Sequence, residues 1–155
     1  MGFMGKRKAK QMLDEGMKLH KSGDLKGAEW YYTQALSYDP NNLEAHLNYG
    51  DLLKQTSRPK GAEIEYKKAS IMDPERGEPY GSLGALYHSA KRYDEAEEHY
   101  RKALEMQPGN ITTQLNLAQL LMDTARFTEM RKIYENILHR ITDPRLKKVI
   151  ESRLK

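Results

Sequence analysis

The chain has 155 residues, of which 38% are hydrophobic and 31% charged, so its length corresponds to one domain with a small core for its surface. No apolar run approaches the roughly 18 residues of a membrane helix, and the amino terminus lacks the apolar stretch of a signal peptide, so we expect a soluble, cytoplasmic protein. The absence of cysteine excludes disulfides and thiolate chemistry but does not fix the compartment. The net charge of +4 lies at the ends, because residues 1–10 and 140–155 each carry +4 and residues 11–139 carry −4, which argues against a uniform nucleic-acid-binding stripe.

The first ten residues include four basic side chains, at Lys6, Arg7, Lys8 and Lys10. A run of this kind is usually a solubilising extension of the helix that follows it, and we predict that role here. The alternative is a targeting or nucleic-acid-binding segment.

Residues 9–110 repeat with a period of 34 residues. Three prolines set the register, at Pro40, Pro74 and Pro108, and a period of this length indicates repeated structural units. Small and aromatic residues recur at fixed distances before each proline. They are Gly16, Gly50 and Gly84; Ala28, Ala62 and Ala96; Tyr32, Tyr66 and Tyr100; and Ala35, Ala69 and Ala103.

Each unit has the pattern of two helices. Apolar residues recur three and four apart, a polar or glycine-containing break follows, and Asp-Pro or Gln-Pro ends the second helix. The breaks fall at residues 22–24, 56–59 and 90–92, which is the same register as the prolines. Glycine on one helix and alanine on its partner allow close approach, and the tyrosine fills the neighbouring space.

These glycines, alanines, tyrosines and prolines closely resemble the signature of the tetratricopeptide repeat family. The resemblance implies an all-α fold, a right-handed superhelical solenoid of stacked antiparallel helix pairs. We assign a single domain to residues 1–155, with complete repeats at 9–42, 43–76 and 77–110.

Residues 111–142 continue the pattern as a degenerate fourth repeat. Met130 and Ile137 replace the two alanines, so we expect this helix pair to pack slightly differently. Residues 143–155 follow as a capping helix, which begins at Asp143-Pro144. Its mainly apolar face, which we expect to cover the last repeat, consists of Leu146, Val149, Ile150 and Leu154.

In this family the first helix of each repeat lines a concave side where partners bind, so the resemblance implies a protein- or peptide-binding groove. The positions that it places in this groove are Leu13, Asp14, Met17 and His20 in the first repeat, Leu47, Asn48 and Asp51 in the second, Ser82, Ala85 and His88 in the third, and Leu115, Asn116 and Gln119 in the fourth.

Asn48 and Asn116 occupy the position from which related proteins hold the main chain of an extended peptide, since an amide both donates and accepts hydrogen bonds. Asp14 and Ser82 occupy the same position in the other two repeats, so the resemblance to a continuous asparagine ladder is partial. The other interpretation is that these asparagines satisfy local polar groups or face water.

Many members that bind chaperone C-termini use a clamp of lysine and asparagine side chains for two carboxylates. Here the equivalent positions hold Leu13 and Met17 in the first repeat, Leu47 and Asp51 in the second, and Glu78 and Ser82 in the third. We therefore predict that no such chaperone ligand binds, and that an apolar-to-mixed peptide suits the groove better.

The five histidines have no metal-ligand spacing. His20 and His88 are equivalent residues two repeats apart, which corresponds to roughly 20 Å between stacked helix pairs and is too far for a shared metal. No phosphate-binding loop or nucleophile motif is present. We predict no metal, no cofactor and no enzymatic activity.

Three functions remain, in decreasing order. The first is an adaptor that binds a peptide or helix segment of a partner protein in the concave groove. The second is a scaffold that self-assembles into a homo-oligomer through the repeat ends; aromatic residues beside Trp30 would suit such a contact, although packing within the fold is the favoured account of Trp30. The third is a binder of nucleic acid or a membrane surface through the basic termini.

Overall fold

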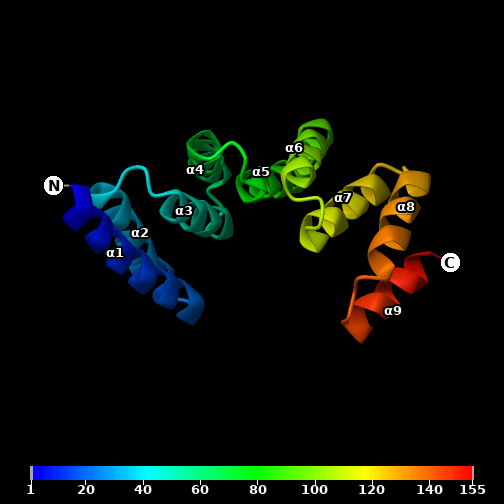
Figure 1. The fold of residues 1–155 in the computed structure, drawn as a ribbon, viewed down its shortest axis with the longest axis horizontal. Helices are drawn as coiled ribbons and strands as arrows, with labels where there is room; N and C mark the ends of the chain where they lie inside the picture. The colour runs from blue at the N-terminus through cyan, green and yellow to red at the C-terminus, as the bar shows by residue number, and fades with distance from the viewer. Residues whose placement is uncertain (1, 155) are drawn as a thin grey trace. The chain divides into compact units, whose positions relative to one another are not determined.

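The computed structural model describes residues 2–154, with the side chains of residues 4–154. All regular structure in this range is α-helical (Figure 1). The helices are α1 (Gly2–Ser22), α2 (Leu25–Tyr38), α3 (Leu43–Gln55), α4 (Pro59–Met72), α5 (Gly77–Ser89), α6 (Tyr93–Met106), α7 (Ile111–Asp123), α8 (Phe127–Leu138) and α9 (Pro144–Arg153). The two residues at the ends of the predicted 1–155 domain, 1 and 155, lie outside the described range.

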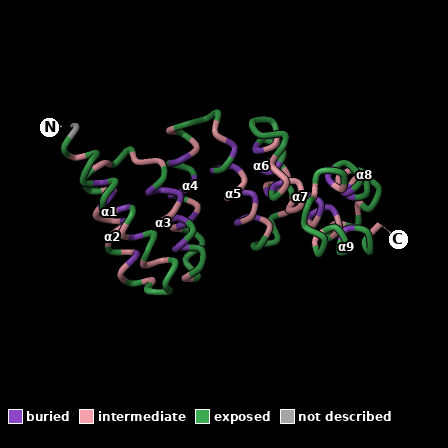
Figure 2. Tube along the Cα trace, turned by 60° about the horizontal axis from the view of Figure 1, so that its bottom comes forward, coloured by how far each residue is buried: buried purple, intermediate pink, exposed green. Residues whose placement is uncertain are grey.

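The chain forms two compact units, residues 1–79 and residues 80–155. In the first unit α1 packs against α2, α3 packs against α4, and α2 also contacts α3. In the second unit α7 packs against α8, α6 contacts α7, and α9 contacts α8. Buried residues lie along the facing sides of the paired helices in both units (Figure 2).

The turns inside the helix pairs have one shared geometry. Each contains a residue with positive φ, namely Gly23 (88°), Ser57 (59°), Lys91 (59°) or Ala125 (57°). The following residue donates its N–H to a carbonyl five positions earlier, as from Arg58 to Leu53 at 2.8 Å. This arrangement closes a helix end, and it explains why the breaks fall at the predicted places.

The connections between helix pairs are set by polar caps. The backbone N–H groups of Asp39, Asp73 and Gln107 donate to the carbonyls of the alanines four residues earlier, and proline follows each of them. Asn42 and Asn110 then begin the next helix, because their side chains accept from the N–H of Ala45 and Thr113, both at 3.0 Å.

The glycines at the centres of the first helices lie directly against the tyrosine rings. A Cβ atom added at Gly16 would lie 2.7 Å from the ring of Tyr32, and one at Gly50 would lie 2.5 Å from that of Tyr66. The equivalent approach in the second unit is 2.5 Å, between Gly84 and Tyr100. The predicted close packing of glycine and tyrosine is confirmed.

The fourth helix pair, α7 and α8, keeps this core with larger side chains. Ala118 stands in the glycine position and Tyr134 in the tyrosine position, and both are buried. Met130 and Ile137, which replace the two alanines, are buried as well. Larger side chains on α8 thus pack at the two positions where the other helix pairs have alanine.

The last helix, α9, begins as predicted, with the Asp143 side chain accepting from the N–H of Arg145 at 2.9 Å and Pro144 in the first turn. Ile150 is buried in the contact with α8. The prediction was wrong for Val149, which is 46% exposed because the residue next to Ile150 in the helix points about 100° away.

Trp30 also differs from its prediction. Its side chain is 56% exposed, and its ring contacts that of Tyr31 edge-on with 4.9 Å between the centroids. The packing account was therefore wrong for Trp30, because the inward position in this part of α2 belongs to Tyr32, which is fully buried.

Candidate functional site

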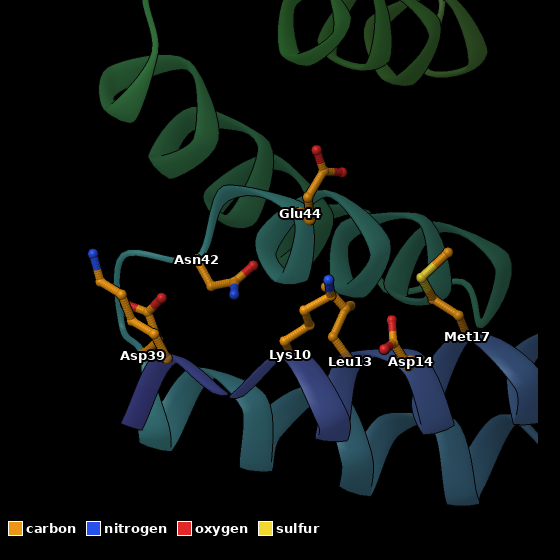
Figure 3. A pocket seen from close by; sticks show the side chains of 8 residues that line it. Lys10, Leu13, Asp14, Met17, Asp39, Asn42 and Glu44 are labelled. Carbon is orange, nitrogen blue, oxygen red and sulfur yellow. The ribbon is translucent and has the colours of Figure 1, made fainter. Parts of the chain in front are cut away.

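The first helices of the first unit, α1 and α3, border two hollows. One has a volume of about 510 Å³ and lies between α1, the connection from α2 to α3 and the start of α3 (Figure 3). The other has a volume of about 460 Å³. Both are lined by Met17, so they adjoin along α1. We call the surface that these two hollows line the α1–α3 face.

The sequence-predicted residues of the first repeat all line this face. Lys10, Leu13, Asp14 and Met17 rise from α1 into the larger hollow (Figure 3). Lys6 lines it as well. Leu13 is almost fully buried and forms its floor, whereas Met17 is 46% exposed and offers apolar surface to a ligand. Asp39, Asn42 and Glu44 complete the lining.

His20 lines the smaller hollow in a fixed orientation. Its Nε2 lies 2.7 Å from Oε1 of Gln55, which accepts, and its Nδ1 lies 3.1 Å from the hydroxyl of Tyr32. Burial, with a smaller contribution from the charge of Asp51, raises the pKa of Tyr32 to about 12. The phenol therefore stays protonated and can donate to Nδ1.

The second repeat contributes differently from what the sequence predicted. Leu47 is only 3% exposed, so it belongs to the core and offers no contact surface. Asp51 is exposed, and its carboxylate accepts a hydrogen bond of 2.5 Å from Tyr66. Asn48 lines the smaller hollow, but its Nδ2 donates to the carbonyl of Glu44 at 2.8 Å, which leaves its Oδ1 as the group for a ligand.

In the second unit the predicted residues lie on α5 and α7 and are half-buried: Ser82, Ala85, His88, Leu115, Asn116 and Gln119. His88 contacts Asp123, with 2.8 Å between Nε2 and Oδ2, and this contact is the main cause that lowers the pKa of Asp123. The amide of Gln119 donates to Asp123 and accepts from Arg153. Gln119 is therefore engaged within the unit, whereas Asn116 makes no side-chain hydrogen bond to the described residues.

Two family models described as "Tetratricopeptide repeat" match the chain, one over residues 19–87 and one over residues 78–110. Together they span more than half of the sequence. The chain belongs to the tetratricopeptide repeat family. A comparison with curated protein sequences gives no match.

Solved structures of tetratricopeptide proteins share this fold. The pilF protein of Pseudomonas aeruginosa matches with a TM-score of 0.84 at 20% identity, covering 97% of this chain and 67% of that one. The OM64 TPR domain of Arabidopsis matches with a TM-score of 0.73 at 24% identity, covering 77% and 98%. The first TPR of Spaghetti (RPAP3), bound to the HSP90 peptide SRMEEVD, matches with a TM-score of 0.73 at 23% identity, covering 77% and 95%.

Ion pairs between successive repeats were not predicted from the sequence. Arg58 donates two hydrogen bonds to Glu29, at 2.7 and 2.8 Å, and Arg126 pairs with Glu97 at 2.5 Å. Both arginines follow a positive-φ turn residue, and both pairs are 29 residues apart. These glutamates and arginines recur at equivalent positions of the 34-residue register, so the same spacing, applied to charged residues, indicates the ion pairs.

Lys6 and Lys10 were also missed as site residues, although they stand at helical spacing before Leu13, Asp14 and Met17.

The described residues contain no cluster of three or more histidine, cysteine or acidic side chains that could hold a metal ion. None of the helices in the described part of the chain has the length and apolar character needed to cross a membrane.

Proposed function

We propose that this tetratricopeptide protein is a non-catalytic adaptor that binds a peptide or helix segment of a partner protein. The observation that carries the proposal is the pair of adjoining hollows on the α1–α3 face. Their volumes fall within the roughly 300–1,000 Å³ that is usual for ligand sites. They combine exposed apolar surface at Met17 with polar groups at His20 and Asn48. A site that contacts both the side chains and the main chain of a peptide needs both kinds of surface.

The second unit carries the remaining predicted residues on α5 and α7. Ser82 and Ala85 are small and half-buried, and the amide of Asn116 has no side-chain partner among the described residues. This supports a sequence-tolerant contact with a peptide main chain there as well. The proposed partner is therefore an extended or helical segment of a protein, and the proposed compartment is the cytoplasm.

The structural neighbour that binds an HSP90 peptide supports peptide binding as a function of this fold. It does not support the same ligand, because the clamp positions of this chain hold Leu13, Met17 and Asp51 in place of basic and amide side chains. We propose a peptide of mixed or apolar character and not an acidic chaperone C-terminus.

Site-specific photo-crosslinking tests the proposal. A photoreactive phenylalanine analogue replaces Met17 on the α1–α3 face or, as the control, Ile71 on α4, which is 77% exposed. In extract of the source cells, we expect adducts from position 17 that are absent from position 71. Adding Asn48→Ala to the position-17 protein is expected to reduce their yield, because it removes the free amide oxygen.

The other two functions predict different results. Adducts with copies of the same chain, formed from position 71 as readily as from position 17, would favour a self-assembling scaffold. Adducts that form equally from positions 17 and 71, survive Asn48→Ala and disappear in high salt would favour binding through the basic termini. Either result would remove the α1–α3 face as the site.

A further inference from the structure

The larger hollow is bordered at one end by a part of α1 that precedes the first repeat. The 34-residue register places the start of the first repeat at residue 9, whereas α1 begins at Gly2. Gly5 lies in this extension, and a Cβ atom added there would lie 3.0 Å from the carbonyl oxygen of Tyr38. The added turns of α1 therefore pass close to the carboxyl end of α2.

The close approach of the α1 extension to α2 adds a wall at one end of the larger hollow. The extension supplies Lys6, the first full turn of the repeat supplies Lys10 and Leu13, and Asp39 and Asn42 stand on the chain between α2 and α3. Without the extension, the wall that carries Lys6 would be absent. The part of the wall that carries Lys6 is therefore a feature of this chain and not of the repeat pattern.

The two lysines are the available cations of the hollow. Both are exposed, and neither forms an ion pair with a described residue. The hollow also contains three carboxylates, and none of them forms an ion pair with either lysine. Glu44 pairs with Arg76 at 2.6 Å, and Asp39 accepts from the N–H of Asn41 at 3.3 Å.

The third carboxylate, Asp14, lies one turn beyond Lys10 along α1. The lining residues along α1 are therefore Lys6 and Lys10, then the apolar Leu13 beside Asp14, and then Met17. Figure 3 shows the part from Lys10 to Met17. Such an order favours a ligand with negative charge at the Lys6 end and an apolar side chain over Leu13 and Met17. Asp14 can accept a main-chain N–H from the same ligand.

We propose that the hollow bordered by the α1 extension is a specificity pocket for an internal peptide motif, in which one large apolar residue is accompanied by an aspartate or glutamate. The apolar side chain rests on Leu13 and Met17, and the ligand carboxylate pairs with Lys6 and Lys10. This inference rests on the proposed peptide-binding function. It adds the side-chain chemistry that the partner must present, and it requires no free C-terminus.

Panning a phage-displayed library of random linear peptides on the whole chain tests the pocket. The enriched sequences are expected to share an apolar residue with an acidic neighbour, and a synthetic peptide of that consensus provides the probe for affinity measurements. The variant Lys6→Glu/Lys10→Glu replaces both cations of the pocket by carboxylates. The variant Arg7→Glu/Lys8→Glu makes the same charge change on the same helix, at exposed residues that do not line the pocket.

We expect the pocket variant to weaken binding of the consensus peptide about tenfold or more, since two partly exposed ion pairs are lost and replaced by repulsion. The control variant should bind within about twofold of the wild type. Replacing the acidic residue of the peptide by its amide should abolish the difference between the two variants.

Failure of the pocket and failure of the proposed function give different results. Enriched peptides without an acidic residue, or peptides that bind both charge variants equally but are lost with Met17→Glu, would overturn the pocket and leave peptide binding on the α1–α3 face intact. Absence of any enrichment that depends on Met17 would overturn both.

Discussion

At the scale of single residues, the packing of the first unit depends on glycines, whose lack of a side chain makes room for a neighbouring ring. Gly50 contributes no side chain, and the ring of Tyr66 occupies the space where its Cβ would lie, 2.5 Å away. Tyr66 is fully buried, and its hydroxyl donates to the carboxylate of Asp51, one of the predicted groove residues on α3. A change at Gly50 therefore acts on the core and on a candidate ligand contact together.

We predict that Gly50→Ala destabilises the protein by about 1–3 kcal/mol. The clash with a buried ring outweighs the roughly 1 kcal/mol gained by replacing glycine with alanine in a helix. Gly81→Ala is the matched control, because a Cβ atom there meets nothing closer than 3.5 Å, and it should stabilise the protein by up to about 1 kcal/mol. Urea unfolding followed by circular dichroism measures both. Equal effects of the two substitutions would contradict the packing account.

A second buried residue, Glu65, carries a charge that the core must satisfy. His46 is buried beside it, with 2.5 Å between Nδ1 and Oε2, and Lys68 donates to the other carboxylate oxygen at 2.9 Å. Nε2 of His46 donates to the carbonyl of Pro40 at 2.9 Å. Burial alone would raise the pKa of Glu65, but these hydrogen bonds and charges lower it below its usual value of 4.5.

The lowered pKa fixes how the stability contributed by Glu65 depends on pH. A carboxylate with a lower pKa in the folded state contributes its full stability above its unfolded pKa, and loses it as the pH falls through the folded pKa. We predict that Glu65→Gln costs about 1–3 kcal/mol at neutral pH, and that this difference from the wild type shrinks as the pH falls below about 4.5. Urea unfolding across this range measures it; a constant difference would show that the charge of Glu65 is not responsible.

At the scale of helices, the sequence predicted the regular features well because they rest on local chemistry. The cap at Asp143, the turns near Gly23, and the glycine–tyrosine contacts all follow from residue types at fixed spacing. What the spacing does not contain is the rotation of each helix about its axis. Val149 and Ile150 are both apolar and adjacent, and only the position of α8 decides which of them is buried.

The same limit applied to the candidate site. Leu47 and Met17 look equivalent as apolar groove residues, yet the first is buried and the second exposed. The lysines of the hollow could not be assigned to it, because their position depends on how closely the α1 extension approaches α2. Tertiary packing, which no local pattern encodes, decided each of these cases.

The last helix offers a direct test of this distinction. We predict that Ile150→Ala destabilises the protein by about 2–4 kcal/mol, since it removes a side chain that is 1% exposed in the contact of α9 with α8. Val149→Ala, one residue away, should change stability by no more than about 0.5 kcal/mol. Urea unfolding of the two variants measures both changes in the free energy of unfolding. If both cost the same, α9 does not pack through Ile150.

At the scale of the whole molecule, charge separates the proposed function from the electrostatic alternative. The net charge of +4 comes from the ends, but part of the basic carboxyl-terminal end is already engaged. Arg140 donates to the carbonyl of Gly109 at 2.7 Å, and Arg153 donates to the hydroxyl of Tyr134 at 2.7 Å. These two guanidinium groups keep their charge but are held against the second unit, whereas Lys6 and Lys10 form no ion pair with a described residue and border an apolar floor.

Salt should therefore affect the two kinds of ligand unequally. Between about 50 and 200 mM salt, a protein that neutralises 6–10 phosphates loses about 10³–10⁵ in affinity, because counterions are released. We predict that duplex DNA binds this chain weakly and is released within that range. The consensus peptide should lose only a few-fold, because screening weakens its two ion pairs and leaves its apolar contacts with Leu13 and Met17 unchanged. Fluorescence anisotropy with both labelled ligands gives the comparison, and a peptide slope as steep as that of DNA would mean that charge alone holds the peptide on the α1–α3 face.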